Sequence, residues 1–385
     1  MKKLRIPVIL VLFFSLSVFV FAGGGKEKDA PETAAPVKEE AFSLEKLIEL
    51  AKAEGELVVY DTSSKIEPIG ELFSQKYGIT VKATKMGNPE QVERVKREVD
   101  AKNIQVDVVG ISDAPIIVND LIPQGYVVNW VPPDLADVIP AEFHMPLNYR
   151  TGQRIFGYNS ESYQSNPVTN IWQLTEESWK GKVFLRDPAT TPANIAFFAA
   201  LTKPEYAKKL SDSYKEFYGK PLKLTEKNAG WEWVIRFFKN DPVVMRSDGD
   251  VGDAVGAPGQ KDAPIGFYTY AKQRDNEKGL KLAAAFTMKP FIGYASGTNA
   301  VMVNGCSHPN AAKLFIRFLL TEEGVAPFMK DIGVYSPNPA VTVHADDDLG
   351  SWKAWSEYMV ILDDKLTWEI GQDILDLWLI NTSGK

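Results

Sequence analysis

Short apolar segments alternate with helical segments in this chain, and this alternation limits the possible folds more than any other feature. Residues 57–60 form the continuous apolar run Leu-Val-Val-Tyr, and residues 106–109 form a similar run, Val-Asp-Val-Val. Runs of this kind are typical of strands that are buried on both faces of a parallel sheet. The segments between them have helical periodicity, and we expect Ser43 to cap the first helix. This part of the chain therefore predicts a right-handed α/β layer.

The same alternation resumes after Tyr149. Strands are predicted at 182–185, 243–245, 264–268 and 298–303, and helices through Asn194 and Phe198 and at 205–218, 226–238 and 310–320. Two helices that carry tryptophan are predicted within residues 351–380. Since the chain has 385 residues, and single cores stop growing at about 250–300 residues, we expect two domains.

The N-terminal segment has the pattern of a secretory signal peptide. Three basic residues precede an apolar run from Ile6 to Phe21, and Val20 and Ala22 suit signal-peptidase cleavage after residue 22. The alternative is a permanent anchor, although the run is shorter than the ~20 residues of a membrane-spanning helix. Residues 23–42 are rich in Ala, Pro, Glu and Lys and are predicted to be a flexible tether. The mature protein is thus expected outside the cytoplasm, in the periplasm or associated with the cell envelope.

Charge and composition argue against several classes of function. The formal net charge is −7, and loss of the basic leader would make the mature chain more acidic, which disfavours nucleic-acid binding. Cys306 is the only cysteine, so an intrachain disulfide is impossible. The three histidines are scattered and do not have the spacing of a zinc site. We therefore predict neither a cofactor nor a metal from composition alone.

Short hydroxyl or carboxylate side chains follow four of the predicted strands. The carboxyl ends of strands in open α/β sheets form the ligand crevice, and helix N-termini there bind anions through free N–H groups. The alternative for each position is simple helix capping. Occurrence at four strand ends favours a shared ligand cleft, and the candidate ligand-binding residues are Ser63, Ser64, Ser112, Asp113, Thr190, Thr191 and Asp248.

Three further residues are candidates near the later strands. Tyr268 and Tyr270 could stack on a ring or bind a hard metal, or they could pack at a domain edge. Arg246 could clamp a phosphate or carboxylate, or form a surface ion pair. The chain has no Gly-x-Ser-x-Gly, His-Glu-x-x-His or phosphate-binding glycine motif. An enzyme is therefore disfavoured, although an exported enzyme on the same scaffold stays an alternative.

Several segments together resemble the periplasmic solute-binding proteins of ABC importers, in the branch with ferric-iron, hexose-phosphate, phosphonate and thiamine receptors. The segment ELVVYDTSSKIEPIGELFSQKYGITV resembles the first strand, loop and helix of that family, and VDVVGISDAP resembles its second cleft loop. The segments ESWKGKVFLRDP, SDGDVGDAV and DAPIGFYTYA are similar to its second-lobe segments. The most family-specific segment is SGTNAVMVNGCSHPNAAKLFIRFLLTEEG.

The resemblance implies a two-lobed α/β periplasmic-binding-protein fold of type II, in which each lobe is a mixed sheet flanked by helices. Lobe 1 would hold residues 43–145 and a return segment at 295–335, and lobe 2 would hold residues 146–294. The C-terminal helices within 336–385 would pack on lobe 2. The lobes would close over a solute as a hinge, so that a membrane permease recognises the loaded receptor. The implied protein is a monomer.

The iron-receptor pattern is only partly present. Ser64 stands where family iron receptors commonly have histidine, and Ser112 stands where they have glutamate. Of their two adjacent tyrosines, Tyr270 matches one, Thr269 replaces the other, and Tyr268 lies one residue further back. A ferric ion held by Tyr268 and Tyr270 with an external anion is thus an alternative. The hydroxyl-rich cleft favours a small polar or anionic solute, for instance a sugar phosphate. A receptor that signals to a sensor protein is another alternative.

Overall fold

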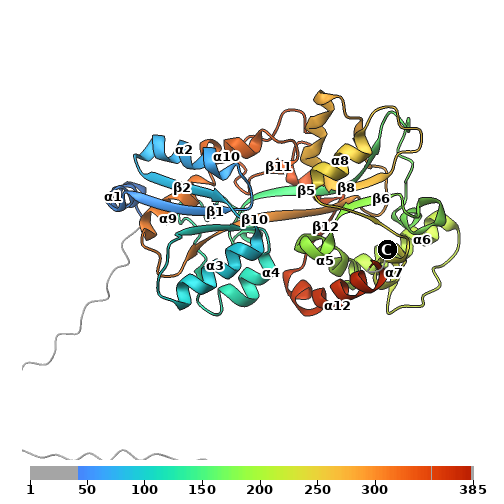
Figure 1. Ribbon diagram of the computed structural model, residues 1–385, viewed down its shortest axis with the longest axis horizontal. Coiled ribbons are helices and arrows are strands. Elements are labelled where there is room, and N and C mark those ends of the chain that lie inside the picture. Colours follow the sequence, from blue (N-terminus) through green and yellow to red (C-terminus); the bar gives the residue numbers. More distant parts are fainter. Residues whose placement is uncertain (1–41, 348, 383–385) are drawn as a thin grey trace, which may run out of the picture. The chain divides into compact units, whose positions relative to one another are not determined.

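The computed structural model describes residues 42–347 and 349–382, so the predictions for a signal peptide and a tether lie outside the described residues, apart from Phe42. A first group of parallel strands comprises β1 (Glu56–Asp61), β2 (Thr80–Lys85) and β3 (Val108–Ile111). Helices α1 (Leu44–Glu54), α2 (Ile66–Tyr77), α3 (Asn88–Asp100) and α4 (Ala114–Ile116) alternate with them. Helix α2 lies on one face of these strands, and α3 and α4 lie on the opposite face (Figure 1). The predicted α/β layer is confirmed.

Local side-chain chemistry determines where the first helices begin and end. The Ser43 hydroxyl accepts a hydrogen bond from the Lys46 amide at 3.2 Å, so Ser43 caps α1 as predicted. Gly55 and Gly78 end α1 and α2 with φ values of 75° and 73°, which are accessible to glycine at little cost. The boundaries of these elements therefore follow from short-range rules.

A second group of parallel strands comprises β6 (Val183–Arg186), β7 (Val243–Met245) and β8 (Ile265–Thr269). Its helices are α5 (Pro192–Leu201), α6 (Pro204–Tyr218), α7 (Ala229–Lys239) and α8 (Asp248–Gly256). Helix α7 begins three residues later than predicted because Asn228 caps it, accepting from the amides of Gly230 and Trp231. The carboxylate of Glu232 also accepts from the amides of Thr225 and Glu226, which holds these residues outside the helix.

Two long antiparallel strands join the two groups. Strand β5 (Asn148–Asn159) pairs with β10 (Gly293–Val303), and the strand order is β2-β1-β3-β10-β5-β8-β6-β7. Figure 1 shows these two strands side by side in the middle of the sheet. Sequence analysis predicted β10 only from Thr298 and did not predict β5, because the polar residues of β5 interrupt any apolar run. The short strands β4 (Val127–Val128), β9 (Leu282–Ala284), β11 (Val334–Tyr335) and β12 (Met359–Ile361) add to the sheet.

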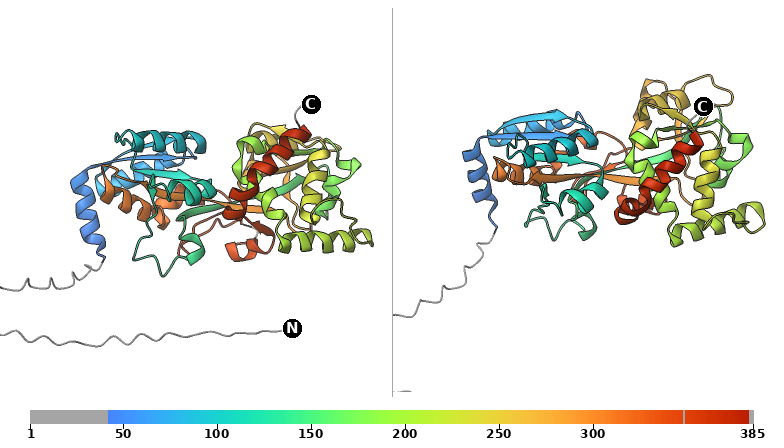
Figure 2. Two further views of the ribbon diagram at one scale, coloured as in Figure 1. Left: turned by 90° about the horizontal axis from the view of Figure 1, so that it is seen from below. Right: turned by 60° about the horizontal axis from the view of Figure 1, so that its bottom comes forward.

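The C-terminal part supplies helices to both groups. Helices α9 (Pro309–Phe318) and α10 (Glu322–Met329) pack on α1 and α2, whereas α11 (Trp352–Ser356) and α12 (Asp364–Thr382) carry tryptophan, as predicted. Helix α12 packs along α5 and α7, and it also contacts α4 (Figure 2). Short helices complete the chain at η1 (Ile117–Leu121), η2 (Ala141–Phe143), η3 (Ile171–Thr175), η4 (Glu177–Trp179), η5 (Pro188–Thr190) and η6 (Tyr270–Lys278).

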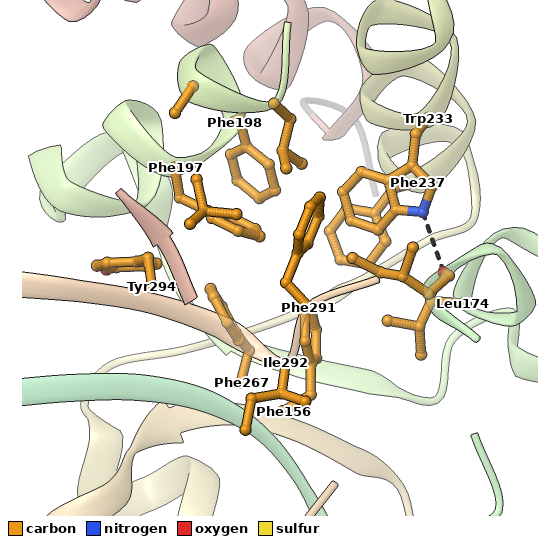
Figure 3. Close-up of a cluster of buried hydrophobic side chains, with 14 of the residues drawn as sticks. Phe156, Leu174, Phe197, Phe198, Trp233, Phe237, Phe267, Phe291, Ile292 and Tyr294 are labelled. Atoms are coloured by element: carbon orange, nitrogen blue, oxygen red, sulfur yellow. Dashed lines mark hydrogen bonds between the residues drawn. The ribbon is translucent and has the colours of Figure 1, made fainter. Parts of the chain in front are cut away.

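Large aromatic side chains form the core around the second strand group. Trp233 is fully buried, stacks on Phe237 with ring centres 4.9 Å apart, and donates its indole N–H to the Ile171 carbonyl at 3.0 Å (Figure 3). A separate buried cluster around Phe73, which contacts Phe315 edge-on, lies under the first strand group. Contacts nevertheless group residues 42–385 as one compact unit, and the lobe boundaries stay a prediction. Among the described residues, no helix is both long and apolar enough to span a bilayer.

Candidate functional site

A polar cavity of about 300 Å³ lies where the carboxyl ends of β1, β3 and β8 approach the middle of β5 and β10. Three cations line it, and no acidic residue is among the described residues that do so. We call it the cationic cavity. Its hydroxyl-bearing residues are Thr62, Ser63, Ser64, Ser112, Thr269, Ser296 and Thr298, its cations are Lys85, Arg150 and Arg154, and Gly152, Gln153 and Gly297 complete the lining.

Strands β5 and β10 give this cavity its floor because alternate residues of a strand point to the same face. Arg150 pairs with Thr298 and Gly152 pairs with Ser296 across the two strands, and all four residues line the cavity. The absence of a side chain at Gly152 leaves space between the two arginines. The guanidinium groups of Arg150 and Arg154 therefore both face the cationic cavity.

The two arginines differ in how firmly carboxylates hold them. Arg154 forms a bidentate ion pair with Asp248, the first residue of α8, and one of its two bonds measures 2.9 Å from Nη2 to Oδ2. Burial by itself would lower the pKa of Arg154, but the Asp248 charge raises it above the ordinary value. Arg154 therefore donates to a carboxylate of the protein itself, that of Asp248 on α8.

Arg150 has a looser arrangement. Its Nη2 lies 3.5 Å from Oδ1 of Asp61, and its Nε donates to the Tyr149 hydroxyl at 3.0 Å. The guanidinium also lies 4.2 Å from the ring centre of Phe328. Asp61 itself is buried and accepts from the Tyr149 hydroxyl at 2.6 Å, and burial raises the pKa of this carboxyl. Arg150 thus retains donor capacity towards the cavity.

A line of hydroxyl groups crosses the cavity wall. The Ser112 hydroxyl lies 3.2 Å from that of Thr298 and 3.4 Å from that of Thr62, so it links loops that follow β3 and β1 to strand β10. The Ser112 amide donates to the Asn88 side chain at 3.0 Å, which fixes this loop. Hydroxyl groups can donate to an anion while they accept from one another. This wall is therefore suited to anionic oxygens.

The opposite face of β5 and β10 borders a second cavity, of about 180 Å³, which we call the acidic cavity. Asp113, Glu142 and Asp364 line it, and no lysine or arginine is among the described residues that do so. Burial, followed by the charges of Asp113 and Asp363, raises the pKa of Asp364 to about 6. Burial also raises the pKa of Asp113. The two faces of one strand pair thus carry opposite charge.

The structure brings some of the predicted site residues together and separates the others. Ser63, Ser64 and Ser112 line the cationic cavity, and Ser112 and Asp113 line the acidic cavity. Asp248 reaches the cationic cavity only through its ion pair with Arg154. Its role as a direct solute contact stays a prediction.

The remaining candidates lie elsewhere. The side chain of Arg246 is 95% exposed and lies 3.8 Å from Asp250, because it follows β7 at the edge of the sheet. Thr190 is exposed, whereas Thr191 is buried next to the acidic-cavity residue Pro192. Tyr268 is buried among Val251, Val255 and Leu282, and Tyr270 packs on Trp355 with ring centres 4.7 Å apart. Neither tyrosine lines the cationic cavity.

Sequence analysis missed the residues of β5 and β10, including both cavity arginines, Gln153 and Thr298. Their signal is the segment Asn148–Asn159, in which Arg150 and Arg154 share one face of a strand with a glycine between them. A strand that alternates in this way presents its polar face to solvent or to a ligand. Among the described residues, no group of acidic, histidine or cysteine side chains has a metal-binding arrangement.

Comparison with known proteins identifies the class of fold. The model of a family described as bacterial extracellular solute-binding protein matches residues 69–359. A search of curated proteins gives no significant match.

Solved structures similar to this one include iron-bound HitA from Pseudomonas aeruginosa, with a TM-score of 0.67 and 17% identity over 85% of this chain and 99% of that chain. The periplasmic binding protein AfuA from Actinobacillus pleuropneumoniae, with fructose-6-phosphate bound, has a TM-score of 0.63 and 18% identity over 86% and 99% of the two chains. The Atu4243–GABA receptor has a TM-score of 0.61 and 16% identity over 86% and 98%. The predicted periplasmic-binding-protein fold is thus confirmed.

Proposed function

The chain belongs to the bacterial extracellular solute-binding protein family and is a solute-binding receptor of an ABC importer, and from this premise we propose that its solute is a small organic phosphate held in the cationic cavity. The observation that carries the proposal is the lining of that cavity, which combines Lys85, Arg150 and Arg154 with seven hydroxyl-bearing residues and no carboxylate among the described residues. Guanidinium groups and hydroxyls are the donors that phosphate oxygens prefer.

The charges behind the cavity support an organic anion of modest charge. Asp61 and Asp248 each lie close to one arginine, so they offset part of the cationic charge. Lys85 lies at the end of β2, and none of the ion pairs described here involves it. A cavity of about 300 Å³ has room for a phosphate group with a carbon skeleton the size of a hexose. The similar protein AfuA was solved with fructose-6-phosphate, which is in keeping with this class of solute.

The iron alternative finds less support at this site. Tyr268 and Tyr270, the two tyrosines that would hold iron, are buried in hydrophobic surroundings and do not line the cationic cavity. Burial raises the pKa of the Tyr268 hydroxyl well above its ordinary value, which opposes the phenolate that ferric iron requires. HitA, which was solved with iron, shares only 17% identity with this chain.

Delivery would require a change of shape on binding. We propose that the two strand groups act as lobes that close around the solute, with β5 and β10 as the hinge, because these strands join the groups and line the cavity. The partner would be a membrane permease that recognises the closed form, and the receptor would act as a monomer in the periplasm or at the cell envelope. We further infer that it binds its solute without converting it.

Isothermal titration calorimetry of the mature protein tests the proposal. The titrants are D-glucose 6-phosphate, inorganic phosphate and ferric citrate. We expect binding of glucose 6-phosphate, weaker binding of inorganic phosphate, and no phosphate release on prolonged incubation. Tight binding of ferric citrate with no heat from either phosphate compound would overturn the proposal.

A further inference from the structure

The pairing of β5 with β10 is irregular at Tyr149. Arg150 pairs with Thr298 and Asn148 pairs with Asn299, so the register shifts between these two pairs and Tyr149 is the extra residue of β5. A β-bulge of this kind re-aims a side chain relative to regular strand alternation. The Tyr149 side chain is fully buried. The bulge thus places a buried phenol beside the cavity residue Arg150.

A buried carboxylate fixes the orientation of the Tyr149 hydroxyl. Asp61 is 1% exposed, and its Oδ2 accepts from this hydroxyl at 2.6 Å, a distance typical of a bond to an ionised carboxylate. Its other oxygen, Oδ1, accepts from the Ser63 amide at 2.7 Å. Because the single hydroxyl proton of Tyr149 is directed to Asp61, the Tyr149 oxygen presents a lone pair to Nε of Arg150, which lies 3.0 Å away.

The neighbouring strand leaves space for the Asp61 carboxylate. Gly110 of β3 pairs with Asp61 of β1, and a Cβ atom at Gly110 would lie 1.9 Å from Oδ2 of Asp61. Atoms that are not bonded to each other do not approach so closely, so any side chain at this position would displace the carboxylate. The position of the Asp61 carboxylate therefore depends on a glycine of β3.

Three contacts hold the Arg150 guanidinium. Its Nε donates to Tyr149, its Nη2 lies 3.5 Å from Oδ1 of Asp61, and the ring of Phe328 covers one face of the group at 4.2 Å. A guanidinium group has five N–H donors, and its bonds to these described residues use two of them. Arg150 also lines the cationic cavity. The contacts thus restrict the orientation of the guanidinium and leave donors for an oxygen of the solute.

We infer that Tyr149 is a positioning residue, which orients Arg150 towards the anionic group of the solute and is itself held by Asp61. Tyr149 is fully buried and is not among the described residues that line the cationic cavity, so it acts through Arg150. This inference rests on the proposed function, because it takes the phosphate group of the solute to bind to Arg150. A purely structural role, in which the hydroxyl only stabilises the fold, is the competing explanation.

A double-mutant cycle separates the two explanations. Tyr149→Phe removes the hydroxyl and keeps the ring, which contacts Phe328 with ring centres 6.0 Å apart. Arg150→Met keeps an aliphatic side chain and removes every donor. Calorimetry gives the dissociation constant of D-glucose 6-phosphate for the wild type, both single variants and the double variant. Tyr163→Phe is the matched control, because the Tyr163 hydroxyl also donates to a carboxylate, that of Asp262 at 3.1 Å, and Tyr163 is not among the described residues that line the cavity.

We expect Tyr149→Phe to weaken binding by about three- to tenfold when Arg150 is present, the effect of one hydrogen bond. In the Arg150→Met background the same change should alter affinity by less than about twofold, because the group that Tyr149 orients has been removed. An equal loss in both backgrounds identifies a structural role and overturns the inference, as does no loss in either. An Arg150→Met variant that binds as tightly as the wild type also overturns it. A wild type that does not bind glucose 6-phosphate overturns the proposed function and this inference together.

Melting temperatures of the solute-free proteins give a second measurement. Tyr149→Phe and Tyr163→Phe each remove a hydroxyl that donates to a carboxylate, so both should lower the melting temperature. Only Tyr149→Phe should combine this loss with weaker binding. If Tyr163→Phe weakens binding as much as Tyr149→Phe does, the effect on affinity does not pass through Arg150, and the inference is wrong.

Discussion

The ion pair between Arg154 and Asp248 links strand β5 to helix α8, and its removal should lower stability measurably. The two side chains are only 12% and 19% exposed and form two bonds. Asp248→Ala leaves the Arg154 charge largely buried without its carboxylate. Loss of one member of a fully buried pair costs about 3–5 kcal/mol, and partial exposure places this case at about 3 kcal/mol.

The expected loss of stability corresponds to a shift in melting temperature that depends on the number of residues that unfold together. Residues 42–385 form one compact unit, and we expect them to unfold in one transition. Its entropy is then about 0.7 kcal/mol per kelvin, so Asp248→Ala should lower the melting temperature by about 4 °C. Differential scanning calorimetry of the solute-free protein measures this shift. Combining Asp248→Leu with Arg154→Met removes both charges and should recover about half of the loss.

A neighbouring ion pair provides the control. Arg246 and Asp250 lie 3.8 Å apart, and the Arg246 side chain is 95% exposed. Asp250→Ala should therefore cost less than about 0.5 kcal/mol. If Asp248→Ala lowers the melting temperature no more than Asp250→Ala does, Arg154 does not need its carboxylate, and the assignment of Arg154 to an internal partner is wrong.

Three further predictions concern binding, pH dependence and the core. Arg150→Gln removes charged donors and should weaken binding of glucose 6-phosphate by about 10- to 100-fold in calorimetry. Lys85 is exposed, so Lys85→Gln should weaken this binding only a few-fold. The pKa of Asp364 is raised to about 6, so the folded state holds this proton more tightly than the unfolded state does. The contribution of Asp364 to stability should therefore be largest below about pH 4 and fall by ~1–2 kcal/mol up to about pH 6. Urea denaturation should show that the Asp364→Asn variant lacks this part of the pH dependence of the wild type. Trp233→Ala should cost about 3–5 kcal/mol in urea denaturation, whereas Trp368→Ala, at a residue that is 53% exposed, should cost little; equal costs would contradict the burial argument.

Sequence patterns located the loops of the site more reliably than its strands. Ser63 and Ser112 follow neighbouring parallel strands, so the topology alone brings them to one edge of the sheet. Arg246 also follows a predicted strand, but β7 lies at the edge of the sheet, and the position of a strand in the sheet order cannot be derived from its own residues. Tyr268 lies in a strand that is buried on both faces, and only the packing of α8 decides that its side chain faces Val251.

The opposite charges on the two faces of β5 and β10 could not be predicted from either segment alone, because they arise from the pairing of the two strands. Arg150 and Thr298 face the cationic cavity, whereas Thr151 and Asn299 border the acidic cavity with Asp113 and Asp364. A one-residue shift of either strand would exchange the two sets of side chains. The carboxylates on one face would repel an anionic solute and the cations on the other face would attract it, so the register of this strand pair determines which side of the pair an anion would occupy.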